Sequence, residues 1–316
     1  MHDRLVTVFG GSGFVGRYVV KHLVARGVRV RVAVSRPDQA LFLKPMGAVG
    51  QIVTMQANLR VPTSVVAAVA GADAVVNMVG ILYERGHQSF DAVQAQGAET
   101  VAAAAVRAGV ARLVQVSAIG ADPLSPARYA RSKAAGEAAV RGLVPGAAIV
   151  RPSVVFGPED QFLNRFASLA RLSPVLPLIG GGKTRFQPVY AGDVAAAIVR
   201  ILERPETAGQ TFELGGPRIL TFADLLRFVL NETGRKRLLL PMPVSLGLLQ
   251  AFFCERLPVP PLTRDQVHLL QRDNVANPQA PGLAALGILP TALEAIAPTY
   301  LLRFRRGGAA IIPRLG

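Results

Sequence analysis

Short runs of apolar, largely β-branched residues alternate with longer amphipathic segments over the first half of the chain. Most of these runs are apolar at nearly every position, which is typical of parallel strands buried on both faces of a sheet. The second run differs, because Arg29 and Arg31 alternate with its valines. The predicted strands cover residues 5–9, 28–34, 51–55, 74–79, 112–117 and 147–151.

The segments between these runs have the length and spacing of helices, and Gly27, Gly71 and Gly109 stand where three of them should end. The predicted helices cover residues 14–26, 38–46, 62–70, 88–108 and 127–143. Strands that alternate with helices in this way predict an α/β fold of Rossmann type, with a doubly wound parallel sheet.

Proline and glycine become frequent after Arg151. We therefore expect two domains: the doubly wound sheet in residues 1–151, and a smaller, mixed C-terminal lobe in residues 152–316 that interleaves with the end of the sheet. The helices and strands expected in this lobe cover residues 160–172, 192–202, 222–233 and 244–257 (helices) and 184–189 and 210–214 (strands).

The composition narrows the class of protein. Of the 316 residues, 51% are hydrophobic and 17% are charged, which excludes a disordered or low-complexity chain. A single cysteine, Cys254, excludes a disulfide framework and a cysteine-rich metal site. The histidines are too scattered for the HxxxH or HExxH spacing of a zinc site; they are His2, His22, His87 and His268.

The net charge of +15 favours an anionic partner: a phosphorylated cofactor, an acidic lipid, an acidic protein surface or a nucleic acid. Nucleic acid is the weakest of these, because tryptophan is absent, tyrosine is sparse and no helix-turn-helix or RNP-like pattern occurs.

Two uncharged stretches bear on membrane insertion. Residues 274–293 are interrupted by prolines and glycines, and the 17 residues of 238–254 fall short of the ~20 that a spanning helix needs. We expect no transmembrane helix. The opening Met1-His2-Asp3-Arg4 runs directly into a strand, which predicts no signal peptide.

The predicted helix over 244–257 carries an apolar stripe of Leu246, Leu249, Phe253 and Leu257. Such a stripe usually belongs to the core. The alternative is an interfacial helix that reaches acidic lipid headgroups together with basic residues of the lobe. Those residues are Arg256, Arg264, Arg303, Arg305, Arg306 and Arg314.

The most specific local signal is the glycine-rich turn after the first strand, which reads Gly10-Gly11-Ser12-Gly13-Phe14-Val15-Gly16. Gly10 permits a sharp turn, Gly13 lets the backbone approach a pyrophosphate, and Gly16 allows close packing of helix on strand. The amino end of the helix then faces the anion. The pattern predicts a dinucleotide site, the alternative being a tight turn without a ligand.

The end of the second strand indicates which dinucleotide binds. An acid there would accept a hydrogen bond from the ribose 2′-OH of NAD, but the chain has Ser35 and Arg36. A guanidinium and a hydroxyl would bind a 2′-phosphate, and Arg17 adds charge nearby. We therefore expect NADPH (NADP), the alternative being that Arg36 is a solvated loop residue.

Tyr129 and Lys133 form a YxxxK array after the fifth strand. In a helix these two side chains share one face. An ammonium lowers the pKa of a nearby phenol toward general-acid use, and it can also hold the nicotinamide ribose.

The glycine turn, this array and Arg151-Pro152-Ser153 before Gly157-Pro158 resemble the extended (atypical) short-chain dehydrogenase/reductase superfamily. Within it, three segments are similar to the branch of the 39-kDa accessory subunit of respiratory complex I and its bacterial relatives. These segments are residues 7–20, 43–51 and 156–167.

The resemblance implies a protein that holds NADPH tightly, in a largely structural role. It would be a peripheral, membrane-associated accessory subunit of the respiratory chain, on the peripheral arm of NADH:ubiquinone oxidoreductase near the quinone site. This implies the cytoplasmic or matrix face of the energy-transducing inner membrane. Some members of the branch are linked to ubiquinone biosynthesis.

The resemblance also assigns further cofactor contacts. Asn58 and Leu59 would flank the adenine, and Pro152 and Ser153 would border the nicotinamide. The segment from Asn77 through Val79 to Gly80 would line the path from the pyrophosphate to the nicotinamide ribose. Asn77 could instead cap the backbone at a strand end without contacting a cofactor. Asp193 is explained more simply as an acid at a helix N-terminus than as a catalytic residue.

Catalysis is left open by the residues. A working reductase needs a hydroxyl beside the tyrosine, but Ser117 is followed by Ala118 and Ile119. Ser117 or Ser125 would have to supply that hydroxyl, and the alternative for Ser117 is a bond to local backbone. A missing donor typically costs ~3 kcal/mol of transition-state stabilisation.

Three functions fit the sequence. The first is a cofactor-holding accessory subunit with little or no catalysis. The second is an active NADPH-dependent reductase or epimerase that acts on a quinone precursor or an isoprenoid-like substrate. The third is a sensor of the NADPH/NADP⁺ ratio, which would require different partner affinities for the two cofactor forms.

Overall fold

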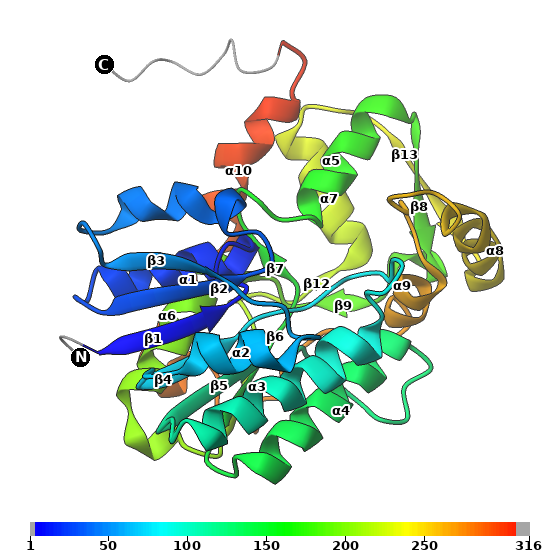
Figure 1. Ribbon diagram of the computed structural model, residues 1–316. Coiled ribbons are helices and arrows are strands. Elements are labelled where there is room, and N and C mark those ends of the chain that lie inside the picture. The colour runs from blue at the N-terminus through cyan, green and yellow to red at the C-terminus, as the bar shows by residue number, and fades with distance from the viewer. Residues whose placement is uncertain (1–3, 308–316) are drawn as a thin grey trace, which may run out of the picture. The chain divides into compact units, whose positions relative to one another are not determined.

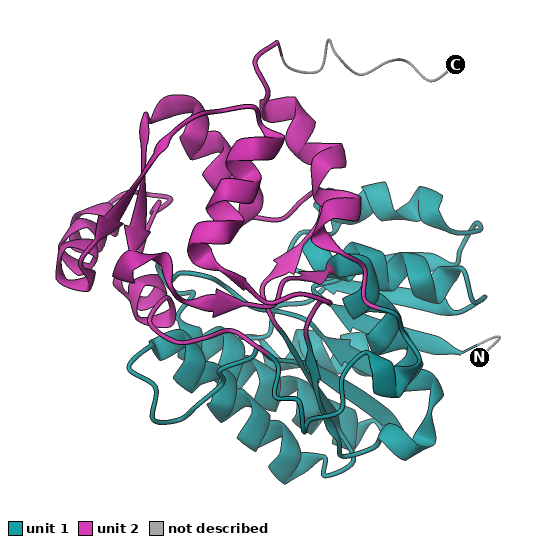
Figure 2. Cartoon of the chain, turned by 180° about the vertical axis from the view of Figure 1, so that it is seen from behind, with its two compact units in different colours: residues 1–152, 191–214, 276–289 teal, residues 153–190, 215–275, 290–316 magenta. Residues whose placement is uncertain are grey.

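The computed structural model describes residues 4–307, so His2, the predicted opening before Arg4, and Arg314 lie outside the described residues. The chain forms two compact units (Figure 2). Unit 1 comprises Met1–Pro152, Ala191–Leu214 and Ala276–Leu289, and unit 2 comprises Ser153–Tyr190, Gly215–Val275 and Pro290–Gly316. The chain first passes from unit 1 to unit 2 after Pro152, and it returns to unit 1 at Ala191–Leu214 and at Ala276–Leu289.

Unit 1 is built on a seven-stranded sheet in the order β11-β6-β5-β4-β1-β2-β3, and every neighbouring pair is parallel (Figure 1). The order reverses between β1 and β4, which is the topological switch point of a doubly wound sheet. The predicted Rossmann-type fold is confirmed. The strands are β1 (Leu5–Phe9), β2 (Arg29–Val34), β3 (Ile52–Gln56), β4 (Ala74–Asn77), β5 (Arg112–Val116), β6 (Ala148–Pro152) and β11 (Thr211–Leu214).

Helices cover both faces of this sheet. On one face α1 packs against α6, and on the other α3 packs between α2 and α4. The α-helices are α1 (Phe14–Val24), α2 (Pro62–Val69), α3 (Gln96–Arg107), α4 (Arg128–Leu143) and α6 (Ala191–Glu203). The predicted helix over 38–46 is a 3-10 helix, η1 (Pro37–Met46), with Pro45 inside it. The one over 88–108 begins as a π-helical turn, η2 (Asp91–Ala95). The short 3-10 turns η4 (Pro205–Thr207) and η5 (Ala284–Leu286) complete unit 1.

One of the two arginines that interrupt the apolar pattern of β2 has a structural explanation. The guanidinium of Arg31 donates to the carbonyl oxygens of Ala68 and Ala70, both at 2.7 Å, where α2 ends. Carbonyl groups at the end of a helix have no partner within the helix itself. A cation near the C-terminus of α2 also interacts favourably with the dipole of the helix. Arg31 therefore ties α2 to the sheet.

Unit 2 combines helices with pairs of short strands. Its helices are α5 (Leu163–Leu172), α7 (Phe222–Glu232), α8 (Val244–Cys254), α9 (Arg264–Leu269) and α10 (Leu293–Leu301), with the 3-10 turns η3 (Gly180–Gly182) and η6 (Leu302–Phe304). Its strands are β7 (Val155–Phe156), β8 (Val175–Ile179), β9 (Arg185–Phe186), β10 (Val189–Tyr190), β12 (Leu220–Thr221) and β13 (Leu238–Met242). The pairs are β7 with β10, β8 with β13 and β9 with β12. The strand predicted over 184–189 is thus two strands, separated at Gln187-Pro188.

A buried carboxylate organises the start of α5 in unit 2. The side chain of Asp160 accepts hydrogen bonds from the backbone N–H groups of Leu163 at 2.7 Å and Asn164 at 3.2 Å, and from the Tyr300 hydroxyl at 2.6 Å. Burial raises the pKa of Asp160, while these hydrogen bonds act in the opposite direction. Asp160 caps α5 and joins it to α10, so the 156–167 motif has a structural role in this unit.

The apolar stripe on α8 is not part of a core. Leu246, Leu249 and Phe253 on α8 are 49%, 54% and 62% exposed, and Leu257, which lies past the end of the helix, is 53% exposed. The buried positions of the helix are Gly247 and Ala251. The expectation of a core stripe is wrong for these side chains. Within residues 4–307, no helix combines the length and apolar character needed to cross a membrane.

We predict that Gly16→Ala lowers the free energy of unfolding by about 3 kcal/mol or more, because the new Cβ would overlap backbone atoms of Gly10 and Gly11 that cannot move aside. Gly142→Ala is the matched control. It also lies in a helix, its Cβ would meet no atom within 4 Å, and the helix propensity of alanine should stabilise it by up to about 1 kcal/mol. Urea denaturation of both variants tests this; equal stabilities would contradict it.

Candidate dinucleotide site

The glycine-rich turn lies where β1 ends, at the edge of the sheet formed by the carboxyl ends of its parallel strands. Gly10 has φ +76°, a left-handed conformation that favours glycine. Its carbonyl oxygen accepts a hydrogen bond from the N–H of Gly13 at 3.0 Å. A Cβ on Gly16 would overlap that carbonyl and lie 2.7 Å from the Gly11 Cα. The turn and the first helical turn are therefore in direct backbone contact.

The amino end of α1 presents backbone rather than side chains. Gly13 is its N-cap residue, no side chain caps the helix, and its first turn holds no acid. Ser12 precedes this cap, Val15 lies in the first turn, and the ring of Phe14 meets that of Tyr18 edge-on. A cradle of glycine backbone at an uncapped helix N-terminus fits a pyrophosphate, so the residues present suit a dinucleotide.

The residues expected to bind the 2′-phosphate of the ribose lie at the same carboxyl edge of the sheet. Ser35 and Arg36 follow β2 and both are exposed. Within the described part of the chain, the Arg36 guanidinium makes no hydrogen bond or ion pair. The Arg17 guanidinium stacks over the Phe42 ring, 5.0 Å from its centroid.

Asn77 ends β4 and is buried. Its amide group donates to the Gln115 side chain at 2.9 Å, and its side-chain oxygen accepts from the N–H of Val79 at 3.2 Å. The capping alternative therefore describes what Asn77 does here. Asn58 likewise accepts from the N–H of Arg60 at 3.1 Å, while the Leu59 side chain is buried in the core.

Tyr129 and Lys133 lie in the first two turns of α4. The Lys133 side chain is buried, and its ammonium lies 3.4 Å from the Val116 carbonyl oxygen at the end of β5 and 5.8 Å from the centroid of the Tyr129 ring. A Cβ on Gly80 would lie 3.2 Å from Lys133 Nζ, so this glycine gives the ammonium its room. Burial lowers the pKa of Lys133 to about 8, against an opposing effect of Glu137.

The two candidate hydroxyls differ in their surroundings. Ser125 Oγ accepts a hydrogen bond from the N–H of Ala127 at 3.2 Å, next to the start of α4. Ser117 is 4% exposed, and its Oγ has no hydrogen-bond partner among the described residues. A buried hydroxyl without a partner is costly and rare, so its position at the end of β5 marks it as a group open to a ligand.

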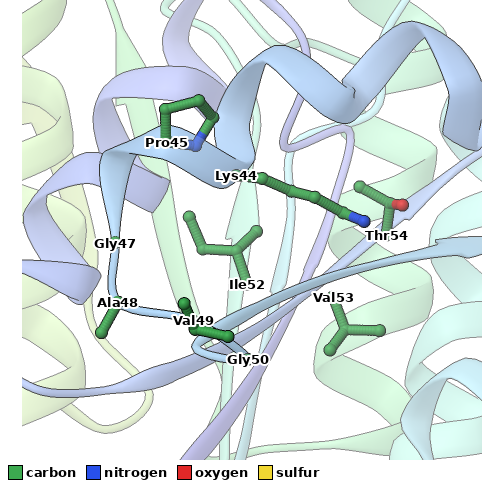
Figure 3. A pocket seen from close by; sticks show the side chains of 9 residues that line it. All are labelled: Lys44, Pro45, Gly47, Ala48, Val49, Gly50, Ile52, Val53 and Thr54. Atoms are coloured by element: carbon green, nitrogen blue, oxygen red, sulfur yellow. The ribbon is translucent and has the colours of Figure 1, made fainter.

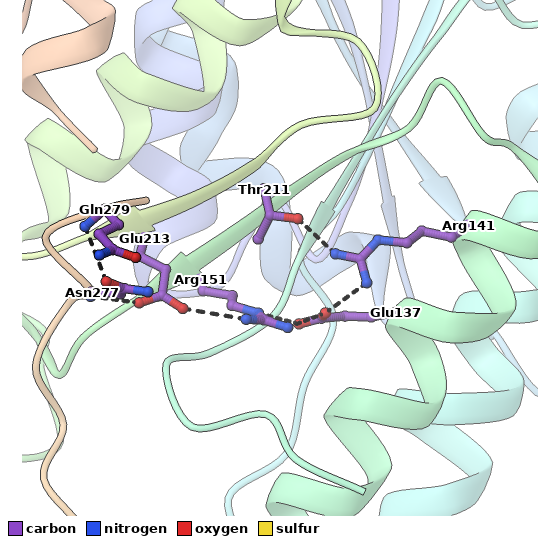
Figure 4. A network of polar contacts seen from close by, with 7 residues as sticks. All are labelled: Glu137, Arg141, Arg151, Thr211, Glu213, Asn277 and Gln279. Atoms are coloured by element: carbon purple, nitrogen blue, oxygen red, sulfur yellow. Dashed lines mark hydrogen bonds and ion pairs between the residues drawn. The ribbon is translucent and has the colours of Figure 1, made fainter. Parts of the chain in front are cut away.

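Sequence reasoning missed an ion-pair network around the buried Glu137, four residues after Lys133 on α4 (Figure 4). Arg151 on β6 donates to both carboxylate oxygens of Glu137, at 2.8 and 2.7 Å, and to Glu213 on β11 at 3.2 Å. Arg141 lies 3.5 Å from the same Glu137 carboxylate. The signal in the sequence was an acid one helical turn after Lys133, on the face of α4 that turns toward the sheet.

The remaining predicted residues fall in three places. Pro152 ends β6, and its carbonyl oxygen accepts from the N–H of Ile119 at 3.1 Å. Ser153 belongs to unit 2, where its hydroxyl lies 2.7 Å from the Asn274 side-chain oxygen. Asp193 stands in the first turn of α6, as the simpler alternative predicted.

A surface pocket of about 580 Å³ lies beside β3 and is lined by residues 44–45, 47–50 and 52–54 (Figure 3). Much of the 43–51 motif borders it. Gln51 in that motif donates to the carbonyl oxygens of Val24 at 2.9 Å and Val28 at 3.1 Å. The motif therefore fastens the end of α1, and the predicted dinucleotide contacts lie elsewhere.

Comparison with known proteins places this geometry in a family. The model of the NAD dependent epimerase/dehydratase family matches residues 6–215. A mitochondrial NADH dehydrogenase (ubiquinone) 1 alpha subcomplex subunit 9 from Arabidopsis thaliana is 37% identical over 96% of this chain and 79% of its own length. A ceramide reductase from Caulobacter vibrioides is 32% identical, over 76% of this chain and 74% of its own.

Among solved structures, the triphenylmethane reductase of Citrobacter sp. complexed with NADP(H) superposes with a TM-score of 0.73. It is 18% identical, the match covers 93% of this chain and 99% of that one, and the likeness shows the fold alone. The family match extends over most of the chain and includes the glycine turn, the YxxxK array and the sheet that carries them. This chain belongs to the NAD dependent epimerase/dehydratase family of extended short-chain dehydrogenases/reductases and is homologous to the alpha subcomplex subunit 9 of complex I.

Proposed function

We propose that this protein is an NADPH-holding accessory subunit of respiratory NADH:ubiquinone oxidoreductase, with little or no catalysis of its own. The observation that carries the proposal is the similarity to alpha subcomplex subunit 9, which extends over 96% of the chain. The proposal places the protein peripherally at the cytoplasmic or matrix face of the inner membrane, on the peripheral arm near the quinone site.

NADPH is the proposed dinucleotide because positively charged side chains follow β2 and α1 at the carboxyl edge of the sheet. The backbone N–H groups at the start of α1 would hold the pyrophosphate. Arg36, together with Ser35 and Arg17, would bind the 2′-phosphate, and the two residues directly after β2 include no acid to repel that group. This assignment is supported by the Arg36 guanidinium, which has no hydrogen bond or ion pair with the residues that the structure describes.

The residues at the ends of β4, β5 and α4 would hold the nicotinamide half. The Lys133 ammonium would donate to the ribose hydroxyls, and Gly80 leaves the backbone open beside it. The bound cofactor would supply a hydride to an acceptor. Tyr129, with its ring near Lys133, would then offer a proton to a substrate oxygen.

An active NADPH-dependent reductase or epimerase is the second candidate. The specific observation in its favour is Ser117, whose buried hydroxyl has no partner among the described residues and is therefore available to a substrate oxygen. The ceramide reductase relative supports the same reading. A quinone precursor or another isoprenoid-like molecule would be its substrate.

We further propose that unit 2 meets an anionic lipid surface. Leu246, Leu249 and Phe253 are exposed on α8, and Leu238 and Leu240 are exposed on β13. The Arg256 guanidinium stacks on Phe252, 4.1 Å from the ring centroid, and that of Arg264 lies 5.5 Å from the same centroid. Exposed apolar side chains flanked by arginines are typical of a surface that lies in a membrane interface.

We predict that Arg36→Glu weakens NADPH binding about 10- to 100-fold and leaves NADH binding nearly unchanged, because it replaces a cation at the 2′-phosphate with an anion. The control is Arg107→Glu, which reverses the charge of an exposed side chain on α3 and should alter neither affinity. Fluorescence titration measures both. A wild-type protein that binds the two cofactors equally at low salt would contradict the assignment.

In its native membrane, we predict that the protein migrates with the complex on a native gel and that its NADPH stays bound without turnover. Copurification through a tag on this chain, followed by an assay with small carbonyl compounds, measures both properties. A protein found only as a free soluble species that oxidises NADPH with such a compound would contradict the accessory role and favour the second candidate.

We predict that the protein floats with vesicles that contain anionic phospholipid and that high salt reverses this association, since each basic residue near such a surface contributes ~1 kcal/mol. Phe253→Asp should weaken flotation strongly. Leu124→Asp, at a 90% exposed position in unit 1, should leave it unchanged. Equal flotation of both variants, or no flotation of the wild type, would contradict a lipid-binding role for α8.

A further inference from the structure

Lys133 carries its charge in an unfavourable place. It is 7% exposed, and the hydrogen-bond acceptor that the structure gives its ammonium is the Val116 carbonyl oxygen, at the long distance of 3.4 Å. Burial with so little compensation favours the neutral amine. A neutral amine would donate more weakly to a ribose hydroxyl and would no longer stabilise the phenolate of Tyr129.

Glu137 supplies the opposing charge. It lies four residues after Lys133 on α4, so both side chains project from the same face of the helix. Among the described residues, Glu137 is the charged group whose field acts on Lys133 and raises its pKa. The other elements around the ammonium present the Tyr129 ring, the Val116 carbonyl and the backbone of Gly80.

Glu137 itself needs a partner, because it is 2% exposed and a buried carboxylate without hydrogen-bond donors is costly. Arg151 meets this need with two parallel hydrogen bonds of 2.8 and 2.7 Å, the strongest geometry for such a pair. Glu213 binds the other side of Arg151 at 3.2 Å and also accepts from the N–H of Asn277 at 2.8 Å (Figure 4).

We propose that Glu137 is a positioning residue of the dinucleotide site: it keeps the buried ammonium of Lys133 charged, and Arg151 holds the Glu137 carboxylate in place. The inference deepens the proposed function and rests on the role of Lys133 at the nicotinamide ribose. A purely structural salt bridge would fasten α4 to β6 without affecting Lys133. The two roles therefore differ in what happens to the titration of Lys133 when the carboxylate is removed.

The titration can be measured directly, because the chain has only five lysines. Lysine labelled with ¹³C at Cε gives one NMR signal per residue, and Lys133→Met identifies the signal of interest. In the wild type without nucleotide, we expect a midpoint near pH 8. In Glu137→Gln the midpoint should fall by about one pH unit, since the favourable charge is lost while burial remains.

Two variants control the experiment. Glu137→Asp keeps the charge and should restore most of the midpoint, whereas Glu213→Gln removes a carboxylate from the same arginine and should leave the midpoint unchanged. Should Glu137→Gln fail to fold, Glu137→Gln combined with Arg151→Met removes both members of the buried pair, leaves Glu213 with the Asn277 N–H as a partner, and should still lower the midpoint. An unchanged midpoint without Glu137, or an equal shift in Glu213→Gln, would overturn the inference.

NADPH affinity separates this inference from the function on which it rests. Glu137→Gln should bind NADPH as well as the wild type does at pH 6 but about 3-fold more weakly at pH 7.5, where most of its Lys133 is neutral. A wild type that binds no NADPH contradicts the proposed function alone, since the NMR titration needs no nucleotide. Normal binding with an unshifted Lys133 contradicts the inference alone.

Discussion

The start of α1 depends on a contact between two stretches of backbone that leaves no space for a side chain at Gly16. Because the helix begins directly against the turn after β1, its free N–H groups lie at the carboxyl edge of the sheet, next to the ends of β2 and β4. Parallel strands bring their carboxyl ends to this one edge, and the order reverses there. The candidate dinucleotide site thus depends on the close approach of helix and turn.

Charge at this edge is arranged around a buried lysine. The backbone of Gly80 and the end of β5 both lie close to the Lys133 ammonium. On the same helix, Glu137 pairs with Arg151 on β6, which also pairs with Glu213 on β11. A site built to hold a cofactor and a site built to turn it over would both need this lysine. They differ in the role of Ser117, whose hydroxyl would form a hydrogen bond with a substrate oxygen in a working reductase.

Much of unit 1 could be predicted from sequence, because its strands are buried on both faces and therefore apolar at nearly every position. Unit 2 could not. Its strands β8 and β13 contain Pro177 and Pro241, and proline hides a strand signal although short paired strands tolerate it. The exposed face of α8 was also misjudged, since apolar spacing alone does not distinguish a core helix from one that meets a partner.

The candidate site was predictable where the chemistry is local, in the glycine turn and the YxxxK array. The network around Glu137 was not, because its members come from α4, β6 and β11 and meet only in the folded sheet. Likewise, the sequence could not tell whether the Ser117 and Asn77 side chains would bond local backbone. The structure shows that Asn77 does so and that Ser117 Oγ has no such partner among the described residues.

The central claim is that this sheet edge holds a dinucleotide with a 2′-phosphate. It is tested most directly by identifying the nucleotide that copurifies with the protein. Protein purified without added cofactor and then denatured should release NADP(H), at close to one molecule per chain, when the supernatant is analysed by mass spectrometry. Release of NAD(H) instead, or of no nucleotide even after incubation with excess NADPH, would contradict the account.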